Sequence, residues 1–248
     1  DNCGAIVAAT AVFEQNPKLC SDVIEKAVRS LDYSLSAFAP DGAWEEGINY
    51  WIYSMEYLTR AICALDITFG SDFGLSEYEG LDTAAAWAVS LDAYNGVNSY
   101  HDTWDGMRLD TFALAGLGKI YGADEVLNYR EKTIDQMDYM PVVYDVLWCN
   151  SQENNAEFAN ENYTQKVESV SIRDRFFTAD GSINKTGLFF STHGGMNNAY
   201  HSHLDAGAFV FDLAGERWAM DIPPEDYNAM YAKDGYEYYR KRAEGHNT

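Results

Sequence analysis

The hydrophobic periodicity of the chain changes within the polar stretch 150–165, and this change constrains the fold more than any other feature. Before it, apolar residues recur every three or four positions, as they do in amphipathic helices. After it, short apolar runs separated by glycine and asparagine predict antiparallel strands. The sequence therefore predicts an α+β protein, with a helical domain over residues 1–160 and an antiparallel β-sheet domain over residues 161–248.

The helical half divides into segments bounded by proline, glycine, asparagine or aspartate. The clearest segment, 17–39, starts after Asn16 and stops before Pro40. Further helices are expected at about 47–66, 82–95, 109–121, 124–136 and 139–149. The expected strands lie at 167–174, 186–193, 207–214 and 216–222.

Composition excludes several classes of partner. The chain has 39 acidic and 17 basic residues and a net charge of -22, which argues against binding to nucleic acid or to an anionic membrane surface. It contains no apolar run of about 18 residues, so no membrane-spanning helix is expected. The four scattered cysteines predict free thiols, which favour a reducing, cytoplasmic compartment, although disulfide pairing stays open.

The stretch from His193 to Asp221 holds three of the five histidines. His201, His203 and Asp205 occupy alternate positions, and in an extended segment alternate side chains project to the same face. Two imidazoles and a carboxylate are ligands that zinc accepts, with one coordination position left open. The spacing alone also fits ordinary polar residues near the end of a strand.

Three segments together resemble a known family. They are the run NNAYHSHLDAGAFVFDLAGERWAMD followed by YYRKRAEGHNT, the Glu-Gly-x-x-Tyr segment within DGAWEEGINYWIYSMEYL, and the opening Asn-Cys-Gly. The chain is similar in these segments to the heparinase II/III-like polysaccharide lyases. The resemblance implies part of a longer bacterial enzyme, in which an incomplete (α/α) toroid precedes an incomplete antiparallel β-domain, with toroid helices before Asp1 and strands after Thr248.

The resemblance also implies an activity. Members of the family cleave uronate-containing polysaccharides, such as glycosaminoglycans or alginate-like chains, by β-elimination. A base removes the C5 proton, an acid protonates the leaving C4 oxygen, and other groups neutralise the uronate carboxylate. The low basic content favours a weakly sulfated or unsulfated acidic polysaccharide or oligosaccharide as substrate.

The matching positions carry specific roles. The resemblance makes Tyr50 the base and acid, with Tyr53 as the second choice, and assigns neutralisation of the carboxylate to Asn2 and His201. Some relatives have a histidine where this chain has Cys3. The residues expected to contact substrate are Glu46, Tyr239 and Arg240.

The resemblance separates the two neighbouring histidines of His-x-His. It assigns a mainly structural zinc ion to His203, Asp221 and His246, which would fix the loop so that His201 points into the cleft. Asp205 is then either a partner of one imidazole or a cap of the turn before Gly207. His101 and Asp102 fall in a loop between two helices, where the cleft of a toroid would be lined, but a solvated pair in that loop is the preferred interpretation.

Two other functions stay open at this point. A non-catalytic carbohydrate-binding protein can have the same fold. Glycoside hydrolysis by Glu45 and Glu46 is the second, although adjacent helical residues point about 100° apart and make a poor pair to flank a bond. The particular polysaccharide, endo or exo action and the oligomeric state are not determined by the sequence.

Overall fold

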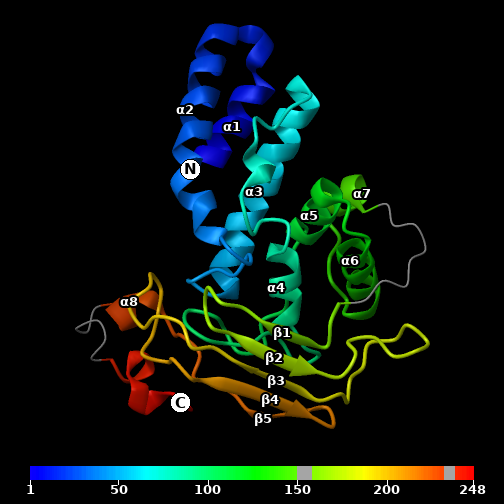
Figure 1. The fold of residues 1–248 in the computed structure, drawn as a ribbon, viewed down its shortest axis with the longest axis vertical. Helices are drawn as coiled ribbons and strands as arrows, with labels where there is room; N and C mark the ends of the chain where they lie inside the picture. The colour runs from blue at the N-terminus through cyan, green and yellow to red at the C-terminus, as the bar shows by residue number, and fades with distance from the viewer. Residues whose placement is uncertain (150–157, 232–237) are drawn as a thin grey trace.

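The computed structural model describes residues 1–149, 158–231 and 238–248. Helices form its N-terminal part, and one antiparallel sheet lies below them in Figure 1. The first seven helices are α1 (Asn2–Ala11), α2 (Pro17–Leu35), α3 (Ile48–Phe69), α4 (Ala84–Ser90), α5 (Ala113–Tyr121), α6 (Asp124–Gln136) and α7 (Val143–Trp148). The strands are β1 (Glu161–Tyr163), β2 (Val170–Arg173), β3 (Phe189–Thr192), β4 (Phe209–Leu213) and β5 (Glu216–Ala219), and α8 (Tyr227–Tyr231) follows them. The expected order of helices followed by an antiparallel sheet is confirmed.

Helix α1 packs on both α2 and α3, and apolar residues of these three helices form much of the core at this end of the molecule. The start of α2 follows from the sequence, because the Asn16 side chain accepts a hydrogen bond from the Leu19 amide at 3.3 Å and Pro17 occupies the first turn. Helix α3 starts after Gly47 and ends at Gly70, whose φ of 70° is the left-handed conformation common at helix ends.

The sheet has the order β1-β2-β3-β4-β5, with every neighbouring pair antiparallel. Strand β1 falls inside the polar stretch that was expected only to separate the domains. It pairs with β2 through Asn162 opposite Ser171, at the edge of the sheet. An edge strand is held by backbone hydrogen bonds and has little apolar surface to bury, so periodicity did not reveal it.

The segment between α4 and α5 attaches the helices to the sheet. Arg173 of β2 donates to the carbonyl oxygens of Val89 and Asp92, both at 3.0 Å, and Asn98 donates to Ser191 of β3 at 2.8 Å. The helices expected at 82–95 and 109–121 are therefore shorter, because the main chain between them bonds to strands. This segment carries His101 and Asp102 into the interior.

All four cysteines are free thiols, as expected. Among the helices of the described residues, none combines the length and the apolar character needed to cross a membrane.

Candidate active site and metal cluster

The five histidines of the chain converge on one region, although they come from four separate segments. His101 lies between α4 and α5, His193 follows β3, His201 and His203 precede β4, and His246 lies near the C-terminus. Two aspartates connect them, Asp102 and Asp205, and both are fully buried.

Asp102 accepts hydrogen bonds from three side chains. One carboxylate oxygen lies 2.9 Å from His203 Nε2, and the other lies 3.0 Å from His201 Nδ1 and 3.2 Å from the Tyr227 hydroxyl. Burial raises the pKa of Asp102, but the hydrogen bonds from the two imidazoles outweigh burial and lower it below its ordinary value. Asp102 is thus a carboxylate that orients both histidines.

The prediction that His101 and Asp102 are solvated was wrong, since their exposed fractions are 3% and 0%. Loops usually run over the surface, but this one is covered by the sheet and by the loop around His203. His101 and His201 both have positive φ angles, 56° and 58°. Such backbone strain in residues other than glycine persists where surrounding contacts enforce it and is common at functional sites.

Tyr50 and His201 lie face to face. Their ring centroids are 3.7 Å apart with an interplanar angle of 21°, and the Tyr50 hydroxyl lies 2.6 Å from the Tyr227 hydroxyl. Burial raises the pKa of Tyr50 above its ordinary value, more than the hydrogen bond to Tyr227 lowers it. Burial also raises the pKa of Tyr227 well above the ordinary range. Both groups are therefore neutral phenols at neutral pH.

Tyr227 is a site residue that the sequence analysis missed. It is one of 18 tyrosines and lies in α8, a helix that no periodic pattern predicted. Only tertiary packing brings it to Tyr50, 177 residues earlier in the chain.

Glu46 lies next to this group. Its carboxylate accepts a hydrogen bond from the Trp44 indole at 3.4 Å, and burial raises its pKa while His201 lowers it. Glu45 instead forms an ion pair with Lys166 at 3.1 Å. The two neighbouring glutamates thus have different partners, which does not favour the hydrolytic pair considered above.

Asn2 and Tyr53 lie in a different place from Tyr50. Both line a pocket of about 210 Å³ that also includes Trp44, and the Asn2 amide donates to Ser30 at 3.0 Å. Trp44 connects this pocket to Glu46 through its indole hydrogen bond. The structure therefore divides the predicted catalytic residues into a Tyr50–His201 pair and a neighbouring pocket that contains Asn2.

The two predicted substrate contacts near the C-terminus lie in a short turn, Tyr239–Lys241. Tyr239 is half exposed, with 52% of its surface accessible. Arg240 lies 3.3 Å from a Glu225 carboxylate oxygen and donates to the Pro223 carbonyl at 2.9 Å. Arg240 would have to release the Glu225 carboxylate in order to bind a uronate carboxylate.

Two of the predicted zinc ligands, His203 and His246, lie together, but Asp205 rather than Asp221 completes the group. His203 and His246 form a possible metal-binding group with Asp205, in which one ligand atom of each lies within 4.8 Å of the others. Asp221 holds His246 Nδ1 through both carboxylate oxygens, at 2.8 and 2.9 Å. The remaining nitrogens, His203 Nδ1 and His246 Nε2, are buried without a hydrogen-bond partner. These residues fit a metal ion, which would accept both free nitrogens.

The fold has known counterparts. No family model and no curated protein matches the chain. Among solved structures, heparan sulfate lyase HepC from Pedobacter heparinus aligns with a TM-score of 0.66 and 11% identity over 100% of this chain and 36% of that chain. Heparinase III aligns with a TM-score of 0.64 and 13% identity over 98% of this chain and 37% of that chain.

The chain thus has the fold of part of a heparinase III-type lyase, along its whole length. The resemblance to the heparinase II/III-like lyases is confirmed at the level of the fold. The chain spans about a third of the length of these structures.

Proposed function

We propose that this chain is part of a polysaccharide lyase that cleaves a uronate-containing polysaccharide by β-elimination and leaves an unsaturated uronate end. The observation that supports this most is the contact between Tyr50, His201 and Tyr227 around buried Asp102. A protein that only binds sugar has no need of such a connected set of proton-carrying groups. The fold shared with heparan sulfate lyase HepC supports the same class of reaction.

In this proposal His201 neutralises the uronate carboxylate. Asp102 binds its Nδ1, so Nε2 is the nitrogen that can face substrate. Asn2 supplies a second, uncharged donor from the adjoining pocket. Positive charge and hydrogen bonds at the carboxylate lower the free-energy barrier to removal of the C5 proton.

The tyrosine pair moves the protons. Tyr50 takes the C5 proton as its own proton passes to the Tyr227 hydroxyl 2.6 Å away, and Tyr227 passes its proton to the Asp102 carboxylate 3.2 Å away. The C5–H electron pair forms the C4–C5 double bond, and the C4–O bond breaks with its electrons on oxygen. Tyr50 then gives its new proton to that oxygen, and the protons on Tyr227 and Asp102 move back to Tyr50 and Tyr227, which completes the elimination. This route does not require a free phenolate at rest, which the raised pKa of Tyr50 disfavours.

The remaining predicted residues support this centre. Glu46, Tyr239 and Arg240 contact the sugar chain on either side, and the helices are part of an (α/α) toroid that the longer protein completes. A zinc ion at His203 and His246, with Asp221 bonded to the second imidazole, would hold the loop that carries His201.

The test is product analysis with the full-length protein on a panel of polysaccharides. We expect ultraviolet absorbance from a conjugated unsaturated uronate, with faster turnover of unsulfated or weakly sulfated chains than of highly sulfated ones, because the net charge of this chain is -22. Added salt should reduce the difference in turnover between weakly and highly sulfated chains, since it screens repulsion between exposed charges. Reducing ends without unsaturation would show hydrolysis, and binding without any product would favour a non-catalytic carbohydrate-binding protein.

A further inference from the structure

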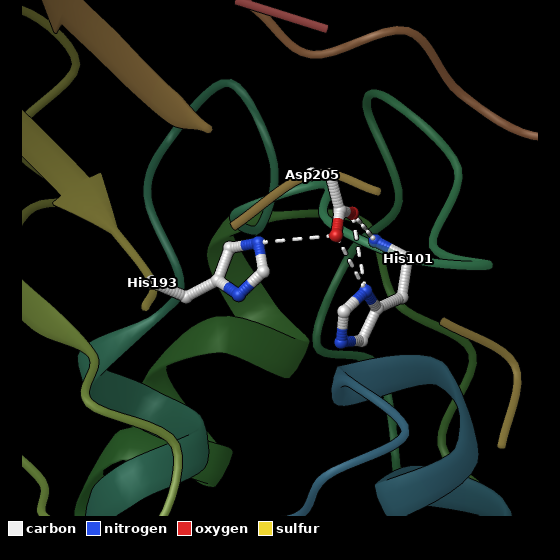
Figure 2. Close-up of side chains that lie close together, drawn as sticks. All are labelled: His101, His193 and Asp205. Carbon is white, nitrogen blue, oxygen red and sulfur yellow. Dashed lines mark hydrogen bonds and ion pairs between the residues drawn. The ribbon is translucent and has the colours of Figure 1, made fainter. Parts of the chain in front are cut away.

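A second group of possible metal ligands shares Asp205 with the group of His203 and His246. Figure 2 shows His101 and His193 converging on the Asp205 carboxylate from separate parts of the chain. His101 Nδ1 lies 3.0 Å from Asp205 Oδ1, and His193 Nε2 lies 3.6 Å from the same oxygen. One ligand atom from each of the three residues lies within 4.8 Å of the others.

This group is enclosed and incompletely hydrogen-bonded. The exposed fractions of His101, His193 and Asp205 are 3%, 1% and 0%. Both ring nitrogens of His193 lack a hydrogen bond, and Asp205 Oδ1 has only its close contacts with the two imidazoles. The Tyr100 ring stacks on His193 with the ring centroids 4.1 Å apart. Leaving buried polar atoms without a hydrogen bond is costly, so these atoms favour a bound partner.

A divalent cation satisfies this group better than water does. Two imidazoles and a carboxylate are a common ligand set for zinc and similar transition metals. The cation would accept a lone pair from each residue and would also compensate the buried negative charge of Asp205, which a neutral water cannot do.

We propose that a transition-metal cation of the zinc type binds His101, His193 and Asp205, as a second site next to the group formed by His203 and His246. Asp205 belongs to both groups, and a carboxylate placed between two pairs of imidazoles can bridge two cations about 3.5–4 Å apart. The second ion joins the loop of His101 to the loop of His203. It thereby fixes the backbone of Asp102, the residue next to His101, where it holds His201 and Tyr227.

Metal content tests this site without any enzyme assay. The full-length protein, passed through a desalting column with a weak chelator, should retain two divalent cations per chain by mass spectrometry. His193→Gln should retain one, because glutamine keeps the size and polarity but does not replace the imidazole as a ligand. His201→Gln is the matched control from the same region, outside both groups, and should retain two.

A second variant covers the case in which His193→Gln does not fold. His193→Cys keeps a metal ligand at the same place, so its cobalt-loaded form should show a near-ultraviolet thiolate-to-cobalt band that cobalt-loaded wild type lacks. The proposal is overturned if wild type holds no more than one cation, if His193→Gln loses none, or if folded, cobalt-loaded His193→Cys shows no such band. These readouts stand whether or not the protein is a lyase.

Discussion

Asp102 connects the residues of the candidate site, because its two oxygens bind His201, His203 and Tyr227. A carboxylate with no exposed surface is stable only when its partners satisfy it, and here imidazole and phenol groups do so. Tyr50 joins this network through Tyr227 and stacks on His201. Substitution of Tyr50 therefore tests proton transfer, and substitution of Asp102 tests the positioning of the other groups.

Tyr50→Phe should reduce elimination by about 10²- to 10⁴-fold or more, the range typical of proton transfer by a placed side chain. Phenylalanine keeps the ring that stacks on His201 but removes the hydroxyl, so kcat should fall while the melting temperature changes little. Tyr33→Phe, at a side chain with 88% exposure, is the control. Activity within tenfold of wild type would move the role to Tyr227, Tyr53 or Tyr239.

Asp102→Asn should lower kcat by roughly 10- to 100-fold by misplacing His201, the scale of losses seen when a residue that orients a functional imidazole is removed. Asparagine keeps the shape but replaces one of the two oxygens that accept from His201, His203 and Tyr227 with an NH2 group. kcat should therefore fall while KM changes much less. Asp135→Asn, on the exposed face of α6, is the control. An unchanged kcat would contradict this role for Asp102.

At the scale of elements, the contact between the sheet and the α4–α5 segment determines where the site lies. Two arginines make this contact from the sheet. Arg173 of β2 binds the carbonyls of Val89 and Asp92, and Arg217 of β5 donates to the carbonyls of Gly96 and Val97 and pairs with Asp212. Both reach main-chain carbonyls just before His101, so the loop is held by the sheet rather than by its own sequence.

Arg173→Met should lower the free energy of unfolding by about 1–3 kcal/mol. The side chain keeps its length, but the buried Asp92 carbonyl loses its donor at about that cost, whereas the Val89 carbonyl keeps the Asp92 amide as a second donor. Arg29→Met is a matched control, because Arg29 forms an exposed ion pair with Glu25, and such pairs contribute about 0–1 kcal/mol. Denaturant titration of both variants gives the comparison, and equal losses would show that the Arg173 contact is unimportant.

At the scale of the whole molecule, the helical core and the sheet meet around groups that are buried and titratable. Asp92, at the C-terminal side of α4, is fully buried and accepts a hydrogen bond from Tyr129 of α6. Burial raises the pKa of Asp92 to about 6, more than Tyr129 and Arg173 lower it. The protonated form is therefore favoured by folding, so the contribution of this residue to stability should be present below about pH 3.8 and decline as the pH rises through about 6.

Asp92→Asn should remove this pH dependence, since asparagine is neutral throughout. A pKa difference of about two units corresponds to roughly 3 kcal/mol, so the stability of wild type relative to the variant should fall by up to that amount between pH 4 and pH 7. Denaturant titrations of both proteins across this range give the difference in their stability, from which the contributions of the other titrating groups drop out. A constant difference would mean that Asp92 keeps an ordinary pKa in the folded protein.

The sequence by itself determined the class of the fold, the main helices and four of the five strands, because hydrophobic periodicity and a helix-starting residue such as Asn16 act locally. It also indicated Tyr50 and His201, through segments that resemble a family. Tertiary structure alone decided that Asp102 is buried, that Tyr227 meets Tyr50, and that Asp205 is shared by two groups of histidines. The contacts of Tyr50 with Tyr227, of Asp205 with His101 and of Asp102 with His201 join residues about 100 or more positions apart, and no local pattern records which side chains meet when a loop packs against a sheet.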